Sequence, residues 1–333
     1  MPLARPARPR IASAHVLGRP PRRVERNAER AQLLIKIVEA VAERPTWAPL
    51  DALLLPAGFF KLEAALGPLR SPDRAKALEA SEIATACVEA AALLRKSTGA
   101  LLVIGSDTTP YGGFSGDQLM AAWGPAGVVG SARKVFPAHG DTAPGKKQPY
   151  LLFEQDADDP GRVVTLPGGS KTLLCLCYDA FLFSELARGP TSSRSAMRYL
   201  GEADGSQKLD AATRDGMLDR FGAMVRREAP QSALIAVHGF EQPGGETRWQ
   251  RHGIASTSAG LGGGLAVGAA HFRYWLPDPD ELDHATLASS GVAKSHLTQG
   301  LHRKARKHTA EDAFLVKVRG SPRLRAVVRL FTS

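Results

Sequence analysis

Two side chains in this sequence have the chemistry of a nucleophile and of a cation that could stabilise negative charge. Cys177 closes an apolar run, residues 173–177, that is typical of a buried strand delivering a side chain at its carboxyl end. Lys134 lies upstream in the segment Arg-Lys-Val-Phe-Pro. A thiolate attacks carbonyl or nitrile carbon, and a neighbouring ammonium group lowers the thiol pKa from its reference of about 8.5. A cysteine at such a position is more often an inert part of the core, so both interpretations are open at this point.

Three short motifs, taken in order, resemble those of the nitrilase superfamily of carbon–nitrogen hydrolases. In that family a Glu follows a strand ending in Pro, a Lys lies in an Arg-Lys segment, and a Cys precedes an aromatic residue and an acid. Lys134 and Cys177 match the second and third motifs. In the first motif, Leu-Pro-Ala-Gly-Phe-Phe, Ala57 takes the position of the Glu. The resemblance extends from about residue 27 to about residue 272.

The resemblance implies a role for each matched residue. Cys177 would be the nucleophile that forms an acyl or thioimidate intermediate, and Lys134 and the backbone N–H of Tyr178 would stabilise the charge that develops on the substrate. Ala57 leaves the general base missing, and loss of a positioned base costs on the order of 10²–10⁴-fold in rate. We expect no cofactor and no bound metal.

A substitute base would have to lie at the same strand ends as Cys177. Asp107 comes shortly after the predicted strand that ends at Gly105, and His238 follows the one that ends at Val237. His139 comes just after the Lys134 segment. The histidines have pKa values near neutrality that suit a base. Each of the three is equally compatible with an ordinary polar loop residue.

The elements that must position these residues follow from apolar periodicity. The predicted helices are 25–43, 73–96, 181–188, 211–228 and 246–258. The predicted strands are 51–55, 100–105, 117–123, 128–135, 163–166, 172–177, 233–237, 265–272 and 326–331. Alternating helices and apolar strands indicate an α/β protein. The family resemblance implies more: a four-layer α-β-β-α sandwich of the nitrilase type, with two facing sheets between outer helices.

The charge is concentrated toward the two ends of the sequence. The net charge is +10; residues 1–24 carry six Arg and no acid, and residues 301–333 carry nine Lys or Arg against two acids. We interpret residues 1–24, which are rich in Pro and Arg, as a flexible arm, and residues 25–333 as one domain. Its basic part, residues 273–333, matches the family poorly. The basic ends are compatible with non-specific nucleic-acid binding.

The three cysteines, Cys87, Cys175 and Cys177, are too few and too closely spaced for a disulfide scaffold. The first 25 residues lack the apolar core of a secretory signal, and no stretch approaches the roughly 20 apolar residues of a membrane span. These features predict a cytoplasmic protein with no membrane partner. By resemblance we also expect a homo-oligomer.

Three functional hypotheses follow. The first is a divergent hydrolase that cleaves a small-molecule amide or nitrile with Cys177 and an altered base. The second is a nitrilase-like pseudoenzyme that has lost catalysis and acts by binding a ligand or a partner. The third is a nucleic-acid-associated protein that uses its basic termini.

Overall fold

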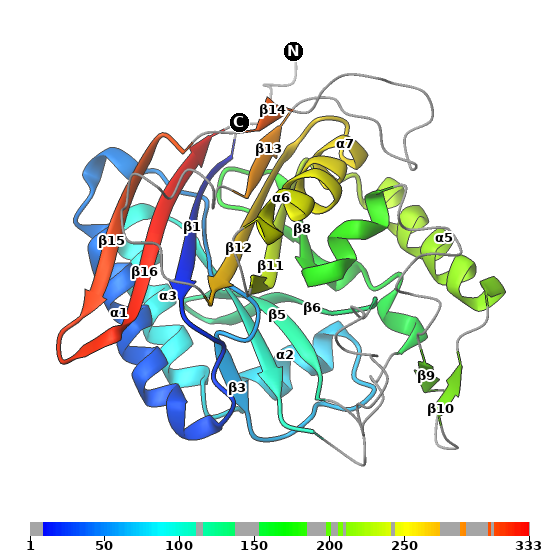
Figure 1. The fold of residues 1–333 in the computed structure, drawn as a ribbon, viewed down its shortest axis with the longest axis horizontal. Helices are drawn as coiled ribbons and strands as arrows, with labels where there is room; N and C mark the ends of the chain where they lie inside the picture. Colours follow the sequence, from blue (N-terminus) through cyan, green and yellow to red (C-terminus); the bar gives the residue numbers. More distant parts are fainter. Residues whose placement is uncertain are drawn as a thin grey trace.

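The fold is taken from a computed structural model of the chain (Figure 1). It describes residues 9–110, 116–136, 153–184, 198–200, 206–208, 211–240, 244–273, 287–290, 306–307 and 310–332. Within these ranges, no helix is both long and apolar enough to cross a lipid bilayer.

The strands fall into a large sheet and a small hairpin. Those of the large sheet are β1 (Arg10–Leu17), β2 (Ala52–Leu54), β3 (Phe60–Leu62), β4 (Leu101–Thr108), β5 (Gln118–Gly124), β6 (Gly127–Arg133), β7 (Val163–Thr165), β8 (Lys171–Leu176), β11 (Ser232–Phe240), β12 (Leu265–Phe272), β13 (Ala288–Ser290), β14 (Arg306–Lys307), β15 (Asp312–Val318) and β16 (Ser321–Thr332). The hairpin is β9 (Arg198–Leu200) and β10 (Ser206–Lys208).

The helices include α, 3-10 and π segments. The α-helices are α1 (Asn27–Ala42), α2 (Ser71–Glu79), α3 (Ala84–Thr98), α5 (Ala211–Glu228), α6 (Gly245–Trp249) and α7 (Ser256–Gly260). The 3-10 segments are η1 (Val24–Arg26), η2 (Pro45–Trp47), η3 (Glu154–Asp156), η4 (Pro160–Arg162) and η5 (Cys177–Phe183), and the π segment is η8 (Gln250–Ala255).

The main sheet is continuous and folds back on itself. Its strand order is β6-β5-β4-β2-β1-β12-β11-β8-β7, and β5 and β6 from one end contact β8 from the other. The first half of the sheet consists of β6, β5, β4, β2 and β1, and the second half of β12, β11, β8 and β7. One apolar cluster lies between the first half and the helices α1 and α3, a second lies between the two halves, and a third lies between the second half and α5. Figure 1 shows α1 and α3 on one side of the strands and α5 on the other. The expected four-layer α-β-β-α sandwich is confirmed.

Successive side chains of a strand point to opposite faces, so one strand contributes to two apolar clusters. On β4, Leu102 packs toward the helices and Val103 toward the facing half of the sheet. On β11, Ile235 packs toward α5 and Leu234 toward the facing half. Because successive side chains point to opposite faces, a strand covered on both sides must be apolar throughout. This is why these runs were recognisable in the sequence.

The interpretation of residues 1–24 as a flexible arm is wrong for Arg10–Leu17, which form β1 near the centre of the sheet. β1 pairs in parallel with β2 and β12, and along its whole length it pairs antiparallel with residues 325–332 of β16. Its two interior polar residues are bonded to β12: Ser13 Oγ donates to the Gly268 carbonyl at 2.6 Å, and His15 Nδ1 accepts from the Ala270 N–H at 3.2 Å. The flanking Arg and Pro residues hid a short buried strand of small side chains.

The single helix predicted for residues 73–96 is divided into α2 and α3. Between them the Ser81 hydroxyl donates to the Leu78 carbonyl oxygen at 2.6 Å, and the Ser81 N–H donates to the same oxygen at 3.1 Å. These contacts compete with the regular helical bonds, so the helix ends and restarts.

Candidate active site

The candidate residues come from strands in both halves of the sheet. Asp107 lies near the carboxyl end of β4, next to the parallel strand β2 that leads to Ala57. His238 lies in β11, next to the parallel strand β8 that leads to Cys177. Carboxyl ends of parallel strands meet at one edge, which is where α/β proteins place their sites. β2 and β4 are therefore hydrogen-bonded neighbours, as are β8 and β11.

Cys177 lies at an abrupt turn. It is the first residue of η5, directly after β8, and its φ of 48° is in the left-handed region that side chains other than glycine rarely adopt. Its side chain is buried and forms a hydrogen bond with His238. A strained backbone at a strand-to-helix turn also positions the nucleophile of α/β hydrolases.

His238 links two of the predicted residues. Its Nε2 is 2.8 Å from Asp107 Oδ1 and 3.1 Å from Asp107 Oδ2, and its ring also bonds Cys177. The ladder between β11 and β12 is irregular between Val237 and Phe240, so His238 lies at a bulge, a feature that often re-aims a side chain beside an active site. The structure therefore brings Cys177, His238 and Asp107 into one hydrogen-bonded row.

The charges in this row favour a protonated imidazole. Burial alone would lower the pKa of His238, but the Asp107 carboxylate and Cys177 outweigh it and raise the pKa to about 10. A protonated His238 in turn favours the thiolate form of Cys177. We expect the two groups to form an imidazolium–thiolate ion pair.

Gly58 makes room for the Asp107 carboxylate. A Cβ placed on Gly58 would lie 2.8 Å from Asp107 Oδ2, and the residue has a φ of +63°. The neighbouring Ala57, at the position of the missing Glu, is completely buried between the two halves of the sheet. Asp107, on β4, therefore places a carboxylate beside this turn, although position 57 is not a Glu.

We expect Gly58→Ala to displace Asp107 and to slow reaction of Cys177 with an alkylating agent. Gly67→Ala is a matched control, because Gly67 has a φ of +62° and nothing lies within 4 Å of its Cβ position. Both variants carry the backbone strain of alanine at positive φ, roughly 1–2 kcal/mol. The measurement is the rate of Cys177 labelling by iodoacetamide. Equal rates in the two variants would contradict the proposed contact with Asp107.

Lys134 is buried at the end of β6, not exposed as a surface lysine would be. Its Nζ donates to Gln118 Oε1 at 2.8 Å. The Asp179 carboxylate accepts from the N–H groups of Val135 and Phe136, each at 3.0 Å. Since Asp179 lies two residues after Cys177, its carboxylate fixes the Lys134 segment against the cysteine turn.

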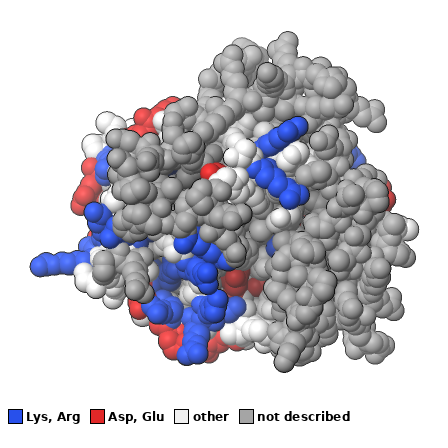
Figure 2. Space-filling view, viewed as in Figure 1, with Lys and Arg blue, Asp and Glu red and all other residues white. Residues whose placement is uncertain are grey.

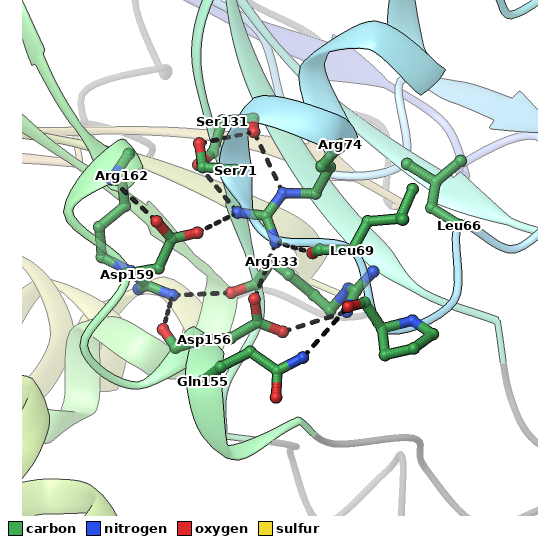
Figure 3. A network of polar contacts seen from close by, with 12 residues as sticks. Leu66, Leu69, Ser71, Arg74, Ser131, Arg133, Gln155, Asp156, Asp159 and Arg162 are labelled. Carbon is green, nitrogen blue, oxygen red and sulfur yellow. Dashed lines mark hydrogen bonds and ion pairs between the residues drawn. The ribbon is translucent and has the colours of Figure 1, made fainter. Parts of the chain in front are cut away.

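A buried network of charged side chains lies next to the turn at Cys177 (Figure 3). Arg74 pairs with Asp156 at 2.8 Å and with Asp159 at 2.5 Å, and Arg133 pairs with Asp156 at 3.1 Å. Arg162 lies 3.5 Å from Asp179 and donates to the Arg133 carbonyl at 2.9 Å. The network joins α2, β6, η3 and η4, and through Asp179 it reaches the turn after Cys177.

The remaining predicted residues have different outcomes. His139 lies outside the described residues. Tyr178 is half-buried, with its ring stacked 4.7 Å from that of Phe181, and its backbone N–H stays a prediction as a charge-stabilising group. Within the described ranges, no group of three or more His, Cys, Asp or Glu side chains is arranged to hold a metal ion. Cys87, Cys175 and Cys177 are all buried and form no disulfide.

Two features of the site were missed by sequence reasoning. Gln118, the partner of Lys134, lies at the start of a strand and carries no motif. His271, on β12, is completely buried; burial, with the charges of Arg30 and His238, holds its pKa well below the usual range. Only the sheet topology brings these side chains to the site.

None of the known protein-family models matches this sequence, and no curated protein matches it. Solved structures with detectable similarity include a cysteine-to-serine mutant of the nitrilase-superfamily amidase from Nesterenkonia AN1, with 18% identity, a TM-score of 0.44 and 80% of each chain covered. Another is an amidase from Nesterenkonia sp., with 17% identity, a TM-score of 0.41 and coverage of 82% of this chain and 81% of that one. The roles of the residues here must therefore come from their own geometry.

Proposed function

We propose that this chain is a thiol-dependent hydrolase of amide or nitrile C–N bonds and a divergent member of the nitrilase superfamily. The observation that carries the proposal is the row formed by Cys177, His238 and Asp107. The ordered motifs at Lys134 and Cys177 and the four-layer fold support the superfamily assignment. In this proposal the pair of His238 and Asp107 supplies the base that Ala57 lacks.

With an amide substrate, the Cys177 thiolate attacks the carbonyl carbon and a C–S bond forms. The protonated His238 then gives its proton to the departing nitrogen as the C–N bond breaks, leaving a thioester and a neutral imidazole. Asp107 fixes the orientation of the ring throughout, as its two contacts with Nε2 allow. The proton transfer in this half of the reaction uses no group beyond the row.

Hydrolysis of the thioester reverses the proton movements. Neutral His238 accepts a proton from the attacking water, the oxygen bonds to the acyl carbon, and the C–S bond breaks to return the Cys177 thiolate. During both steps negative charge develops on the carbonyl oxygen. The ammonium group of Lys134 and the N–H of Tyr178 are the proposed donors to that oxygen.

The proposal is tested by the rate of Cys177 alkylation with iodoacetamide as a function of pH, followed by peptide mapping. In the wild type we expect a plateau that begins well below pH 8.5, and in His238→Ala we expect the plateau to move to pH 8.5 or above because burial disfavours the thiolate. Cys87 and Cys175 are internal controls, since burial raises the pKa of both thiols. Lys134→Ala should reduce turnover more than alkylation.

Hydrolysis is then measured as release of ammonia from a panel of amides and nitriles. A reactive Cys177 with no turnover of any panel member would contradict the hydrolase proposal and favour the pseudoenzyme hypothesis. Labelling of Cys177 no faster than that of Cys87 would contradict it more directly. Binding of single-stranded DNA that weakens steeply with salt, without thiol reactivity, would favour the nucleic-acid hypothesis.

The pH profile of hydrolysis should be bell-shaped. The acid limb reports formation of the ion pair, and the alkaline limb reports loss of the His238 proton as the pH rises through about 10. The raised pKa also means that this proton stabilises the folded state fully below about pH 6.5, its unfolded value, and that the contribution is lost on the way to about pH 10. An alkaline limb near pH 7 would contradict the pairing with Asp107.

A further inference from the structure

A cavity of about 600 Å³ lies beside the candidate active site and is lined by an unusual number of guanidinium groups. Its basic lining residues are Arg19, Arg22, Arg23, Arg26 and Arg30. Figure 2 shows Lys and Arg side chains gathered around a hollow in the lower part of this face. The volume is in the range that holds small-molecule ligands, roughly 300–1,000 Å³.

The positive charge of the cavity is not balanced by its own acids. Glu29 is the acidic residue in the lining, and it is paired with Arg26 at 2.8 Å. Among the residues that the structure describes, no carboxylate pairs with Arg19, Arg22 or Arg23. Arg273 lies near this group, because burial and then the charges of Arg19 and Arg22 lower its pKa. Clustered guanidinium groups of one sign repel each other unless an anion occupies the space between them.

Arg30 is the most informative member of the lining because it is buried. Its exposed fraction is 6%, its Nη2 donates to the Arg19 carbonyl at 2.7 Å, and its Nη1 is buried with no hydrogen-bond partner in the described part of the chain. Burial, opposed in part by Glu29 and reinforced by Arg26, lowers the pKa of Arg30 to about 10, so it is charged at neutral pH. The Phe59 ring lies over the guanidinium, with its centroid 5.7 Å from Arg30 Cζ, but a ring gives Nη1 no acceptor. A buried charged donor without an acceptor is costly, and a bound anion would satisfy it.

The cavity shares a wall with the row of Cys177, His238 and Asp107. The point where a Cβ on Gly58 would lie is 3.2 Å from Pro20 Cβ, in the cavity lining, and 2.8 Å from Asp107 Oδ2. A second link is His271, whose pKa responds to both Arg30 and His238. A ligand in the cavity would therefore lie close to the Asp107 end of the row.

We propose that this cavity is a binding site for a small molecule that carries a phosphate or carboxylate group, with the anionic group seated between Arg30 and the exposed guanidiniums of Arg22 and Arg23. Guanidinium groups bind both oxyanions through paired N–H bonds, so the two classes share one chemistry. The site goes beyond the proposed hydrolase function. Anion binding does not depend on that activity, and it contributes no group to the reaction.

The test measures the melting temperature of the full chain against increasing concentrations of inorganic phosphate and, separately, of malonate. Chloride at the same ionic strength is the reference. We expect at least one of the two anions to raise the melting temperature in a saturable manner, because a ligand of the folded state stabilises it by mass action. The anion with the tighter apparent dissociation constant identifies the preferred chemical class.

Two variants locate the site. Arg22→Gln/Arg23→Gln changes exposed side chains and should weaken binding of the preferred anion by about tenfold. Arg30→Gln should weaken it by on the order of 10–100-fold, the range for hydrogen bonds to charged groups. The matched control, Lys96→Gln/Arg226→Gln, removes the same charge from exposed positions on α3 and α5 and should bind as the wild type does. The exposed double variant keeps the test decisive if Arg30→Gln does not fold.

Three results would overturn the proposal: no stabilisation by either anion beyond that of chloride, equal weakening in Arg22→Gln/Arg23→Gln and in the control, or binding of a labelled single-stranded DNA without binding of phosphate or malonate. Alkylation of Cys177 is followed in the same samples. Because it reports the hydrolase chemistry separately, failure of the anion site and failure of the proposed function are distinguishable.

Discussion

Replacing His238 with alanine should lower kcat/KM for amide hydrolysis by about 10²–10⁴-fold, the usual contribution of a positioned acid or base. The physical reason is that His238 has two tasks in the proposed cycle: its positive charge maintains the Cys177 thiolate, and its proton moves to the departing nitrogen. No other described side chain in the row can take both, since Asp107 is bonded to His238 itself. The measurement is steady-state ammonia release from the best substrate of the panel.

Asp107→Asn separates charge from shape in the same row. The amide keeps the size of the carboxylate but removes its negative charge, so the pKa of His238 should fall and the alkaline limb of the pH profile should move to lower pH. A residue with a purely structural role would change stability without moving that limb. Unchanged kcat/KM in His238→Ala, in a variant with wild-type melting temperature, would contradict the assignment.

Replacing Asp156 with alanine should lower the free energy of unfolding by about 3–5 kcal/mol, the cost of breaking a buried ion pair from one side. Asp156 is 0% exposed and contacts two guanidinium groups that are also buried, those of Arg74 and Arg133. Removing it leaves Asp159 as the carboxylate paired with Arg74, and Asp117, at 3.4 Å, as the one paired with Arg133. Chemical denaturation monitored by intrinsic fluorescence measures the change.

Asp158→Ala is the control for this effect, two residues along the chain. Asp158 pairs with Arg220 at 3.0 Å, but both side chains are about 40% exposed. Exposed pairs contribute roughly 0–1 kcal/mol, so this variant should be close to the wild type. Similar losses in Asp156→Ala and Asp158→Ala would mean that burial of the network does not matter, contrary to the argument from desolvation.

The parts of the fold that the sequence predicted share a physical cause. The α5 helix has apolar residues at helical spacing, and the strands β4, β8, β11 and β12 are continuous apolar runs. Both patterns arise because burial on one or both faces constrains the residue types. The strands predicted for residues 117–123 and 128–135 correspond to β5 and β6, which pair as an antiparallel hairpin. The position of β1 was not predicted, because its partners β12 and β16 lie far along the chain.

The candidate site was predicted residue by residue, but its arrangement was not. Asp107 and His238 were proposed as alternative bases, whereas the structure shows them bonded to each other. Their strands belong to different halves of the sheet, and no local pattern indicates which strand ends converge. The space beside Gly58 is likewise invisible in the sequence, since a glycine in a turn has many explanations.

The pairing of β1 with β16 makes the order of folding events important. Residues 10–17 find their antiparallel partner about 300 residues further along the chain, and that pairing includes every residue of β1. Until it forms, β1 exposes a row of unsatisfied backbone groups that can pair with another molecule. Such non-local closure slows folding and exposes the chain to aggregation. We therefore expect refolding to be slow, with a yield that falls as protein concentration rises, and truncation before residue 321 to leave a chain that aggregates.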